Sequence, residues 1–290
     1  MALIRAQSRQ SGYTAVVGPG DSGLRYLSFG LLALGDGERW ERTFAGQETV
    51  LVILGGRCDV NGGGRRWEGV GERTNVFDGR PAAVYVPPGC EVSLVGRGAV
   101  EIAVCAAQAE SGPDAALIAP EQVGVRKVGD GACYREIHDI LTADSLPAER
   151  LLVGETYNPP GLWSSYPPHK HDVHQPPLDF ARGGPPLGGG DPEHAEGPPA
   201  EHALEEVYHF QLDPPQGFGI HRVYGEGLPG QGLEDCYAVH DGDTAVITRG
   251  YHPVVAAPGY RLYYLWMLAG EKRELVWSED PAHAWVRNTL

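Results

Sequence analysis

The chain has 290 residues, and its 42% of hydrophobic residues suffices for one large β domain or two smaller ones. A net charge of −15 argues against a nucleic-acid binder, which normally carries a basic face, so we expect no nucleic-acid partner. No apolar run is long enough to cross a bilayer, and residues 1–10 lack the apolar core of a signal peptide. We therefore expect no membrane partner and a cytoplasmic location, in agreement with five scattered cysteines that form no C-x-x-C pair.

Short strand-like runs separated by glycine and proline are the main pattern of the first half of the chain. The 41 glycines and 24 prolines favour many turns and short strands over long helices. We expect an all-β fold, built as an antiparallel sandwich or barrel. The predicted strands of this half cover residues 49–54, 82–86, 91–95 and 99–105.

The second half repeats this pattern. A faint internal repeat pairs Glu48–Leu54 with Glu206–Phe210, and Val84–Val92 with Val246–Pro253. Two barrels in tandem explain such a repeat, and we predict them at residues 1–120 and 121–290. The predicted strands of the second half cover residues 204–210, 219–224, 236–239, 244–248 and 260–266.

Residues 172–203 differ from both halves. They contain several Pro-Pro pairs, three consecutive glycines at 188–190 and few large apolar residues. Such a segment buries too little surface to offset its ordering entropy. We expect a long loop between two strands of the second barrel, beside the site described next, either as a surface insertion or as a lid.

The histidines indicate where the chemistry lies, because the first 137 residues contain none. His169 and His171 alternate along a predicted strand and therefore point to one face. Together with Glu206 and His252 they form a hypothetical mononuclear metal site, whose imidazole and carboxylate ligands suit Zn, Mn, Fe, Ni or Co. The first barrel has no histidine and so no comparable site, and we expect it to serve packing and the formation of a homo-oligomer, a dimer or larger.

Several blocks of the sequence form a distinctive set. The longest is WSSYPPHKHD at residues 163–172, and others are RYLSFG at 25–30, LEEVY at 204–208 and RGYHP at 249–253. These blocks resemble the 5-deoxy-glucuronate isomerases, a family of cupins. Cupins combine an H-x-H motif and a downstream glutamate with a later histidine that follows a glycine-containing turn. The four proposed ligands occupy these places. The resemblance spans nearly the full length and implies two tandem cupin barrels (double-stranded β-helix, or jelly-roll), of which the second binds a divalent metal, commonly zinc.

The resemblance also implies a reaction. The family converts 5-deoxy-D-glucuronate to 5-dehydro-2-deoxy-D-gluconate in myo-inositol catabolism, an aldose–ketose isomerisation of a small sugar acid. A proton moves from C2 to C1 through an enediol, so we expect a general base beside the metal. Two alternatives stay open at this stage: another metal-cupin enzyme such as a dioxygenase, and a non-catalytic sugar-binding cupin.

Residues near the ligands supply the candidates for the remaining roles. Glu205 neighbours Glu206, although a regular strand would turn it to the other face. Arginine suits a bidentate grip on the substrate carboxylate, for which Arg222 is our first choice and Arg249 the second. Lys170 alternates with the two histidines and is expected to point away from the metal. The candidates for the general base or acid are Glu205, Tyr208, Tyr251 and Glu155.

Overall fold

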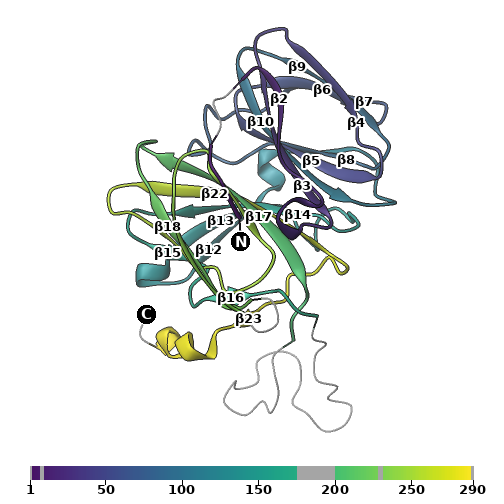
Figure 1. Cartoon of the computed structure of the whole chain (residues 1–290). Helices are drawn as coiled ribbons and strands as arrows, with labels where there is room; N and C mark the ends of the chain where they lie inside the picture. The colour runs from purple at the N-terminus through teal and green to yellow at the C-terminus, as the bar shows by residue number, and fades with distance from the viewer. Residues whose placement is uncertain (1, 7–9, 175–199, 228–230, 289–290) are drawn as a thin grey trace.

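The computed structural model describes residues 2–6, 10–174, 200–227 and 231–288. They form two β-rich bodies, which lie one above the other in Figure 1. Every described strand pairing is antiparallel, and the helices among the described residues are short 3₁₀ turns. The all-β prediction is therefore confirmed.

The first barrel consists of a six-stranded sheet in the order β11-β8-β5-β10-β3-β2 and a four-stranded sheet in the order β4-β9-β6-β7. Glycines and prolines in the short connections end these strands, as expected. The strands are β2 (Gly12–Val17), β3 (Leu27–Leu34), β4 (Arg39–Thr43), β5 (Gln47–Gly55), β6 (Cys58–Gly62), β7 (Arg65–Val70), β8 (Ala83–Val86), β9 (Glu91–Gly96), β10 (Val100–Gln108) and β11 (Ala116–Ile118).

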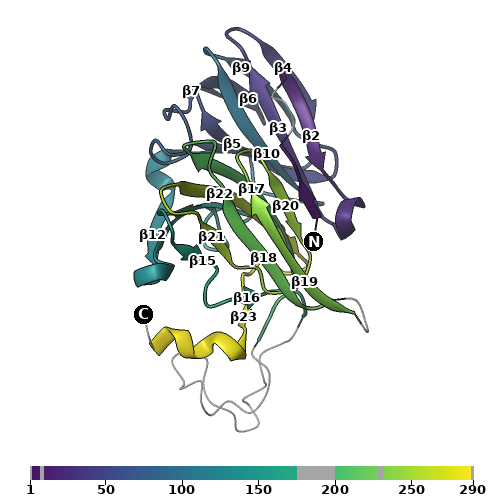
Figure 2. The ribbon, with the colours of Figure 1, turned by 60° about the vertical axis from the view of Figure 1, so that its left-hand side comes forward.

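The second barrel consists of a seven-stranded sheet (β1-β20-β17-β22-β14-β13-β12), a four-stranded sheet (β15-β21-β18-β19) and the pair β16-β23. The 3₁₀ helix η6 (Pro281–Asn288) lies below this pair in Figures 1 and 2. The strands are β1 (Ala2–Ile4), β12 (Gly124–Val128), β13 (Arg135–Leu141), β14 (Leu152–Asn158), β15 (Trp163–Ser164), β16 (His169–Lys170), β17 (Leu204–Asp213), β18 (Gly219–Glu226), β19 (Gly232–Val239), β20 (Thr244–Ile247), β21 (Val254–Ala256), β22 (Arg261–Gly270) and β23 (Ser278–Glu279).

One strand departs from the predicted division at residue 120. The N-terminal strand β1 pairs with β20, with Ala2 opposite Val246 and Ile4 opposite Thr244, and so belongs to the second barrel. The chain therefore begins in the second barrel before it builds the first. The other predicted boundaries stay a prediction, and most of the loop at 172–203 lies outside the described residues.

Strand β5 shows how one apolar run supplies two cores. Its side chains alternate, so that Val50, Val52 and Leu54 pack into a cluster shared by both barrels. Leu51 and Ile53 point the other way, into the interior of the first barrel. Both faces of the strand are buried, which explains why its sequence is continuously apolar.

Two buried or half-buried carboxylates tie the barrels together in a reciprocal way. Glu48 of the first barrel accepts hydrogen bonds from the backbone N–H groups of residues 149–151, at 2.7–2.9 Å. Glu205 of the second barrel accepts hydrogen bonds from residues 25–27, at 2.5–2.7 Å. The structural repeat therefore matches Glu48 with Glu205, and the predicted match with Glu206 is wrong by one residue.

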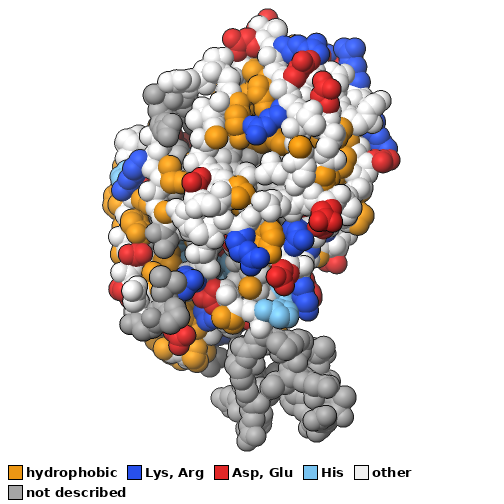
Figure 3. Space-filling model, turned by 45° about the vertical axis from the view of Figure 1, so that its right-hand side comes forward, with side chains coloured by type: hydrophobic (Ala, Val, Ile, Leu, Met, Phe, Trp, Pro, Cys, Tyr) orange, Lys and Arg blue, Asp and Glu red, His pale blue; other side chains and the backbone are white. Residues whose placement is uncertain are grey.

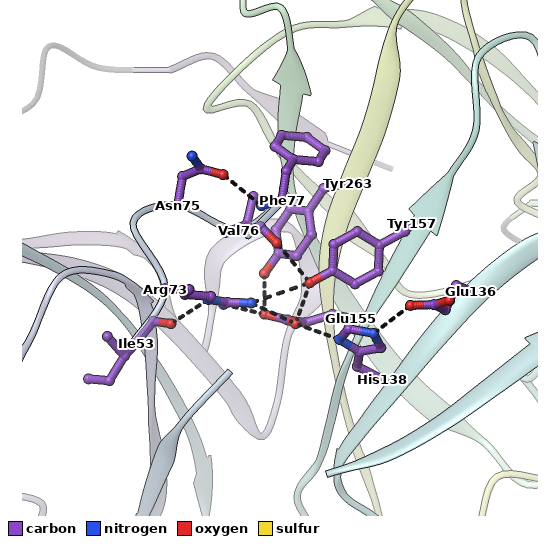
Figure 4. Close-up of polar contacts among 10 residues, drawn as sticks. All are labelled: Ile53, Arg73, Asn75, Val76, Phe77, Glu136, His138, Glu155, Tyr157 and Tyr263. Carbon is purple, nitrogen blue, oxygen red and sulfur yellow. Dashed lines mark hydrogen bonds and ion pairs between the residues drawn. The ribbon is translucent and has the colours of Figure 1, made fainter. Parts of the chain in front are cut away.

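A buried ion pair crosses the same interface (Figure 4). Arg73 of the first barrel contacts both carboxylate oxygens of Glu155 on β14, at 2.6 and 3.1 Å. The hydroxyl groups of Tyr157 and Tyr263 each donate to this carboxylate at 2.8 Å. Burial alone would raise the pKa of Glu155, but Arg73 and the other donors lower it to about 2. Glu155 is therefore an ionised structural residue between the barrels.

Charged side chains are scattered over one face of the molecule. On the face in Figure 3, acidic and basic side chains are interspersed, with apolar side chains between them. None of the described helices is long and apolar enough to span a membrane.

Candidate metal centre and adjoining cavity

Three of the four proposed metal ligands meet inside the second barrel. His171 follows β16, Glu206 lies on β17, and His252 lies in the turn between β20 and β21. Each is buried, with at most 4% of its surface exposed. One donor atom from each lies within 4.8 Å of the other two.

Backbone carbonyl groups fix how the two imidazoles face the carboxylate. His171 Nδ1 lies 3.0 Å from the carbonyl oxygen of Leu204, and His252 Nδ1 lies 2.8 Å from that of Gly250. Since a carbonyl only accepts, each Nδ1 carries a proton, and in the neutral ring each Nε2 presents a lone pair. This is the tautomer that a metal-bound histidine requires.

The two Nε2 atoms then converge on one carboxylate oxygen. Glu206 Oε2 lies 3.2 Å from His171 Nε2 and 3.4 Å from His252 Nε2. His252 Nε2 is buried and has no hydrogen-bond partner among the described residues. Acceptor atoms at such distances repel one another unless a cation lies between them, so the donor set fits a divalent ion.

His169 stands beside this group. Its ring centroid lies 5.1 Å from that of His252 and 6.4 Å from that of His171. Its ring nitrogens are not part of the 4.8 Å group. Burial, followed by the neighbouring rings of His252 and His171, lowers the pKa of His169 well below its ordinary value, so it is neutral and able to bind a metal.

A polar network holds the segments that carry the ligands. Asp172 accepts a hydrogen bond from the Gly250 N–H at 2.8 Å, which joins the end of β16 to the turn before His252. Lys170 Nζ pairs with Asp172 at 2.5 Å and with the buried Glu201 at 3.1 Å. Lys170 is thus committed to this network, on the side away from the metal ligands.

A cavity of about 340 Å³ adjoins the ligand group. Tyr264 and Trp266 project into it from β22, while Leu275 and Trp277 come from the segment before β23. The sequence analysis did not predict these walls. The alternation of side chains in the predicted strand at 260–266 could have indicated Tyr264 and Trp266, but nothing in the sequence places the 275–277 segment here. The lining also includes Arg126, Arg135, Thr156, Tyr166, His169, Glu206, Tyr208, Glu279 and Arg287.

Tyr208 is the proposed catalytic residue that lines this cavity. It lies on β17 two residues after Glu206 and therefore on the same face. Its ring stacks on His221 with a centroid distance of 5.6 Å and lies 6.1 Å from that of His252. Burial, followed by the charge of Glu206, raises the pKa of Tyr208 well above its ordinary value, so it remains a proton donor.

The other base candidates lie outside the cavity, and the contacts of Glu205 and Glu155 contradict their proposed role in catalysis. Glu205 points away from the metal ligands to the inter-barrel contact with residues 25–27. Glu155 pairs with Arg73 across the same interface. Tyr251 precedes His252 in an extended segment that pairs with Tyr224, and it is not among the residues that line the cavity.

Neither predicted carboxylate partner faces the cavity. His221 on β18 is buried, so its neighbour Arg222 lies on the outer face, where it pairs with Glu234 at 2.8 Å. Arg249 donates a hydrogen bond to the carbonyl oxygen of Gly227 at 2.8 Å. This geometry contradicts the prediction that Arg222 or Arg249 binds the substrate carboxylate.

The fold and the site together define a bicupin, with two tandem cupin barrels and a His–Glu–His group able to hold a metal in the second. The chain belongs to the KduI/IolB family, whose model matches residues 2–286. An IolB-like protein from Salmonella typhimurium LT2 has the same fold, with a TM-score of 0.84, 32% identity and coverage of 99% of both chains.

Curated relatives agree with this assignment. The 5-deoxy-glucuronate isomerase of Geobacillus thermodenitrificans is 37% identical over 96% of this chain and 92% of its own length. The enzyme of the same name from Bacillus subtilis strain 168 is 31% identical over 92% of this chain and 89% of its own. An oxalate decarboxylase from Lactobacillus farciminis shares the fold alone, with a TM-score of 0.61 and 10% identity over 98% of this chain and 88% of its own.

Proposed function

We propose that this chain is the aldose–ketose isomerase that converts 5-deoxy-D-glucuronate to 5-dehydro-2-deoxy-D-gluconate in myo-inositol catabolism. The observation that carries the proposal is the similarity to enzymes of that name over 96% of the chain, at 37% identity. The buried donor group and the adjoining cavity support the proposal.

His169, His171, Glu206 and His252 are the proposed ligands of a divalent ion, for which zinc is our first choice. When bound there, such an ion supplies Lewis acidity toward the carbonyl oxygen and the neighbouring hydroxyl of the sugar. Manganese, iron, nickel and cobalt suit the same donor atoms.

The reaction moves hydrogen without a net change of redox state. The C2 proton is transferred to C1, and the O2 proton is transferred to O1, as an aldehyde becomes a ketone. Tyr208 holds a proton at its hydroxyl oxygen on the cavity wall, and we assign it the role of donor toward the sugar oxygens. Tyr264 and Trp266 form aromatic walls of the same cavity.

Isotope exchange tests the proposal directly. Metal-loaded protein is incubated with 5-deoxy-glucuronate in deuterated water, and the products are followed by NMR. We expect the keto acid to form. It should carry deuterium at the former C1 whenever the transferred proton exchanges with solvent before it reaches that carbon. If no keto acid forms, the isomerase assignment is wrong.

A dioxygenase is the second candidate, because two histidines and one carboxylate also form the iron site of non-haem oxygenases. Oxygen consumption by the iron-loaded protein in the same assay distinguishes the two reactions. Turnover without oxygen supports the isomerase.

We further propose a cytoplasmic location and a homo-oligomeric state. All five cysteines lie in the described part of the chain as free thiols, which suits a reducing compartment. Light scattering on the purified protein tests the oligomeric state, and a monomeric mass would contradict it.

A further inference from the structure

We infer that Arg135 binds the carboxylate of the sugar acid, an inference that rests on the proposed function. A uronate substrate places its carboxylate at the end of the chain opposite the reacting C1 and C2 atoms. The cavity beside the metal ligands must therefore offer a cation, and arginine suits a carboxylate because its planar guanidinium donates two parallel hydrogen bonds.

Three arginines line this cavity: Arg126, Arg135 and Arg287. Two of them are already paired with acids. Arg126 contacts both carboxylate oxygens of Asp139, at 2.5 and 2.9 Å. Arg287 is held in the same bidentate way by Glu279.

Arg135 differs because its guanidinium forms no ion pair with any of the described residues. Its one hydrogen bond runs from Nη1 to the carbonyl oxygen of Cys133, at 3.1 Å. The Nε and Nη2 donors are therefore available to a ligand in the cavity. Since the side chain is only partly buried, its charge does not need an internal partner in the absence of substrate.

The local backbone fits around this side chain. Arg135 begins β13, and Ile137 projects from the same face into the same cavity. Gly129, at φ +75°, lets the preceding loop fold back closely. A Cβ on Gly129 would lie 2.2 Å from the carbonyl oxygen of Cys133 and 3.0 Å from Arg135 Nη1. Only glycine permits this approach, so the loop steadies the guanidinium at the cavity wall.

The position also suits the rest of the substrate. His169 and Glu206 are two of the four proposed metal ligands, and both line the cavity. A sugar with C1 and C2 beside them extends into the space that Arg135 lines. Trp266 and Leu268 form apolar walls, which match the CH₂ group at C5 of a 5-deoxy sugar. Asp130, in the loop that precedes Arg135, also lines the cavity, and its side chain is exposed.

The test compares a charged and a neutral substrate. Arg135→Met should lower kcat/KM for 5-deoxy-glucuronate by about 100-fold, because a hydrogen-bonded ion pair is lost. For 5-deoxy-glucose, in which a hydroxymethyl group replaces the carboxylate, kcat/KM should change by less than about threefold. Arg135→Lys keeps the charge but not the paired donors, and should lose about tenfold on the acid alone.

Arg126→Met is the matched control, since it removes a cation from the same cavity that is already paired with Asp139. It should leave the preference for the acid over the neutral sugar unchanged. If Arg135→Met lowers activity on both sugars equally, or on neither, the inference is overturned. A thermal melt of each variant shows that it is folded, and Arg135→Lys provides a readout should the methionine variant fail to fold.

A binding measurement separates this inference from the proposed function. The C1-reduced sugar acid cannot isomerise, and its Kd for the metal-loaded protein is measured by calorimetry. Arg135→Met should weaken binding by about 100-fold. An unchanged Kd overturns the role of Arg135 even if the isomerase is real. The unaltered protein could instead bind the reduced acid in a way that depends on Arg135 but fail to convert 5-deoxy-glucuronate. That result would support the carboxylate site and contradict the isomerase assignment.

Discussion

Two backbone carbonyl groups determine the chemistry of the metal centre. The oxygens of Leu204 and Gly250 accept hydrogen bonds from Nδ1 of His171 and of His252, so that each Nε2 faces Glu206. The residue types were predictable from the H-x-H pattern and the later Gly-Tyr-His turn. Their tautomers were not, because the carbonyl partners come from β17 and from the turn before His252.

Replacement of His252 tests the ligand set. His252→Ala removes a buried donor atom, so bound zinc should fall to a small fraction and isomerase activity should be lost with it. Metal content after dialysis, measured by elemental analysis, gives the first readout. His240→Ala is the control, since that side chain is half-exposed, and it should keep its metal. Full metal content in His252→Ala would contradict the site.

Replacement of Tyr208 tests its proposed role as the proton donor. Tyr208→Phe keeps the aromatic packing on His221 but removes the hydroxyl group, so kcat should fall by about 100-fold while KM and metal content change little. Steady-state kinetics and elemental analysis on the same preparation measure this. If kcat is unchanged, the proton comes from another group.

At the scale of elements, the end of β16 and the β20–β21 turn are held together by Asp172. Its side chain accepts a hydrogen bond from the Gly250 N–H, and the Gly250 carbonyl oxygen in turn accepts a hydrogen bond from His252 Nδ1. The sequence placed His169, His171 and His252 on or near strands, but it gave no sign that Asp172 joins the two segments. This link depends on how two distant segments approach each other.

Asp172→Asn tests this positioning role. Loss of the charge weakens the hydrogen bond to Gly250 and the ion pair with Lys170, so metal affinity should fall by about tenfold. Competition with a chelator measures the affinity, and the midpoint of chemical unfolding shows whether the fold is intact. Asp139→Asn, which alters a surface pair with Arg126, is the control. Equal affinity in both variants would rule out the role of Asp172.

At the scale of the whole molecule, the two barrels are joined by a common apolar cluster, by the reciprocal carboxylates Glu48 and Glu205, and by the Arg73–Glu155 pair. The arrangement follows the pseudo-symmetry of the fold, since each barrel presents an acid to backbone N–H groups of the other. Burial of both members of an ion pair makes the loss of one member costly.

Glu155→Gln should therefore destabilise the protein by about 3–5 kcal/mol, because Arg73 would stay buried without its counter-charge. Urea unfolding measures the change. Arg222→Met removes a cation from an exposed pair and should cost less than about 1 kcal/mol. If the two variants lose similar stability, the inter-barrel pair is not a principal stabilising contact.

The same pair predicts a pH dependence. The pKa of Glu155 is about 2 in the folded protein, below the ordinary value of 4.5 that the unfolded chain retains. Its contribution to stability is therefore complete above about pH 4.5 and is lost as the pH falls toward 2. Unfolding free energies measured between pH 3 and pH 6 should show this loss, and Glu155→Gln should flatten the profile in that range.

The sequence by itself determined the all-β fold and predicted a site in the second barrel with four candidate metal ligands, because strand periodicity and motif spacing are local properties of the chain. Tertiary structure alone decided the return of β1 to the second barrel, the one-residue shift that pairs Glu48 with Glu205, and the inter-barrel role of Glu155. It also decided that Arg135, and not Arg222, faces the cavity. In each case the answer depends on which face of a strand meets which partner, and that is set by packing between segments far apart in the chain.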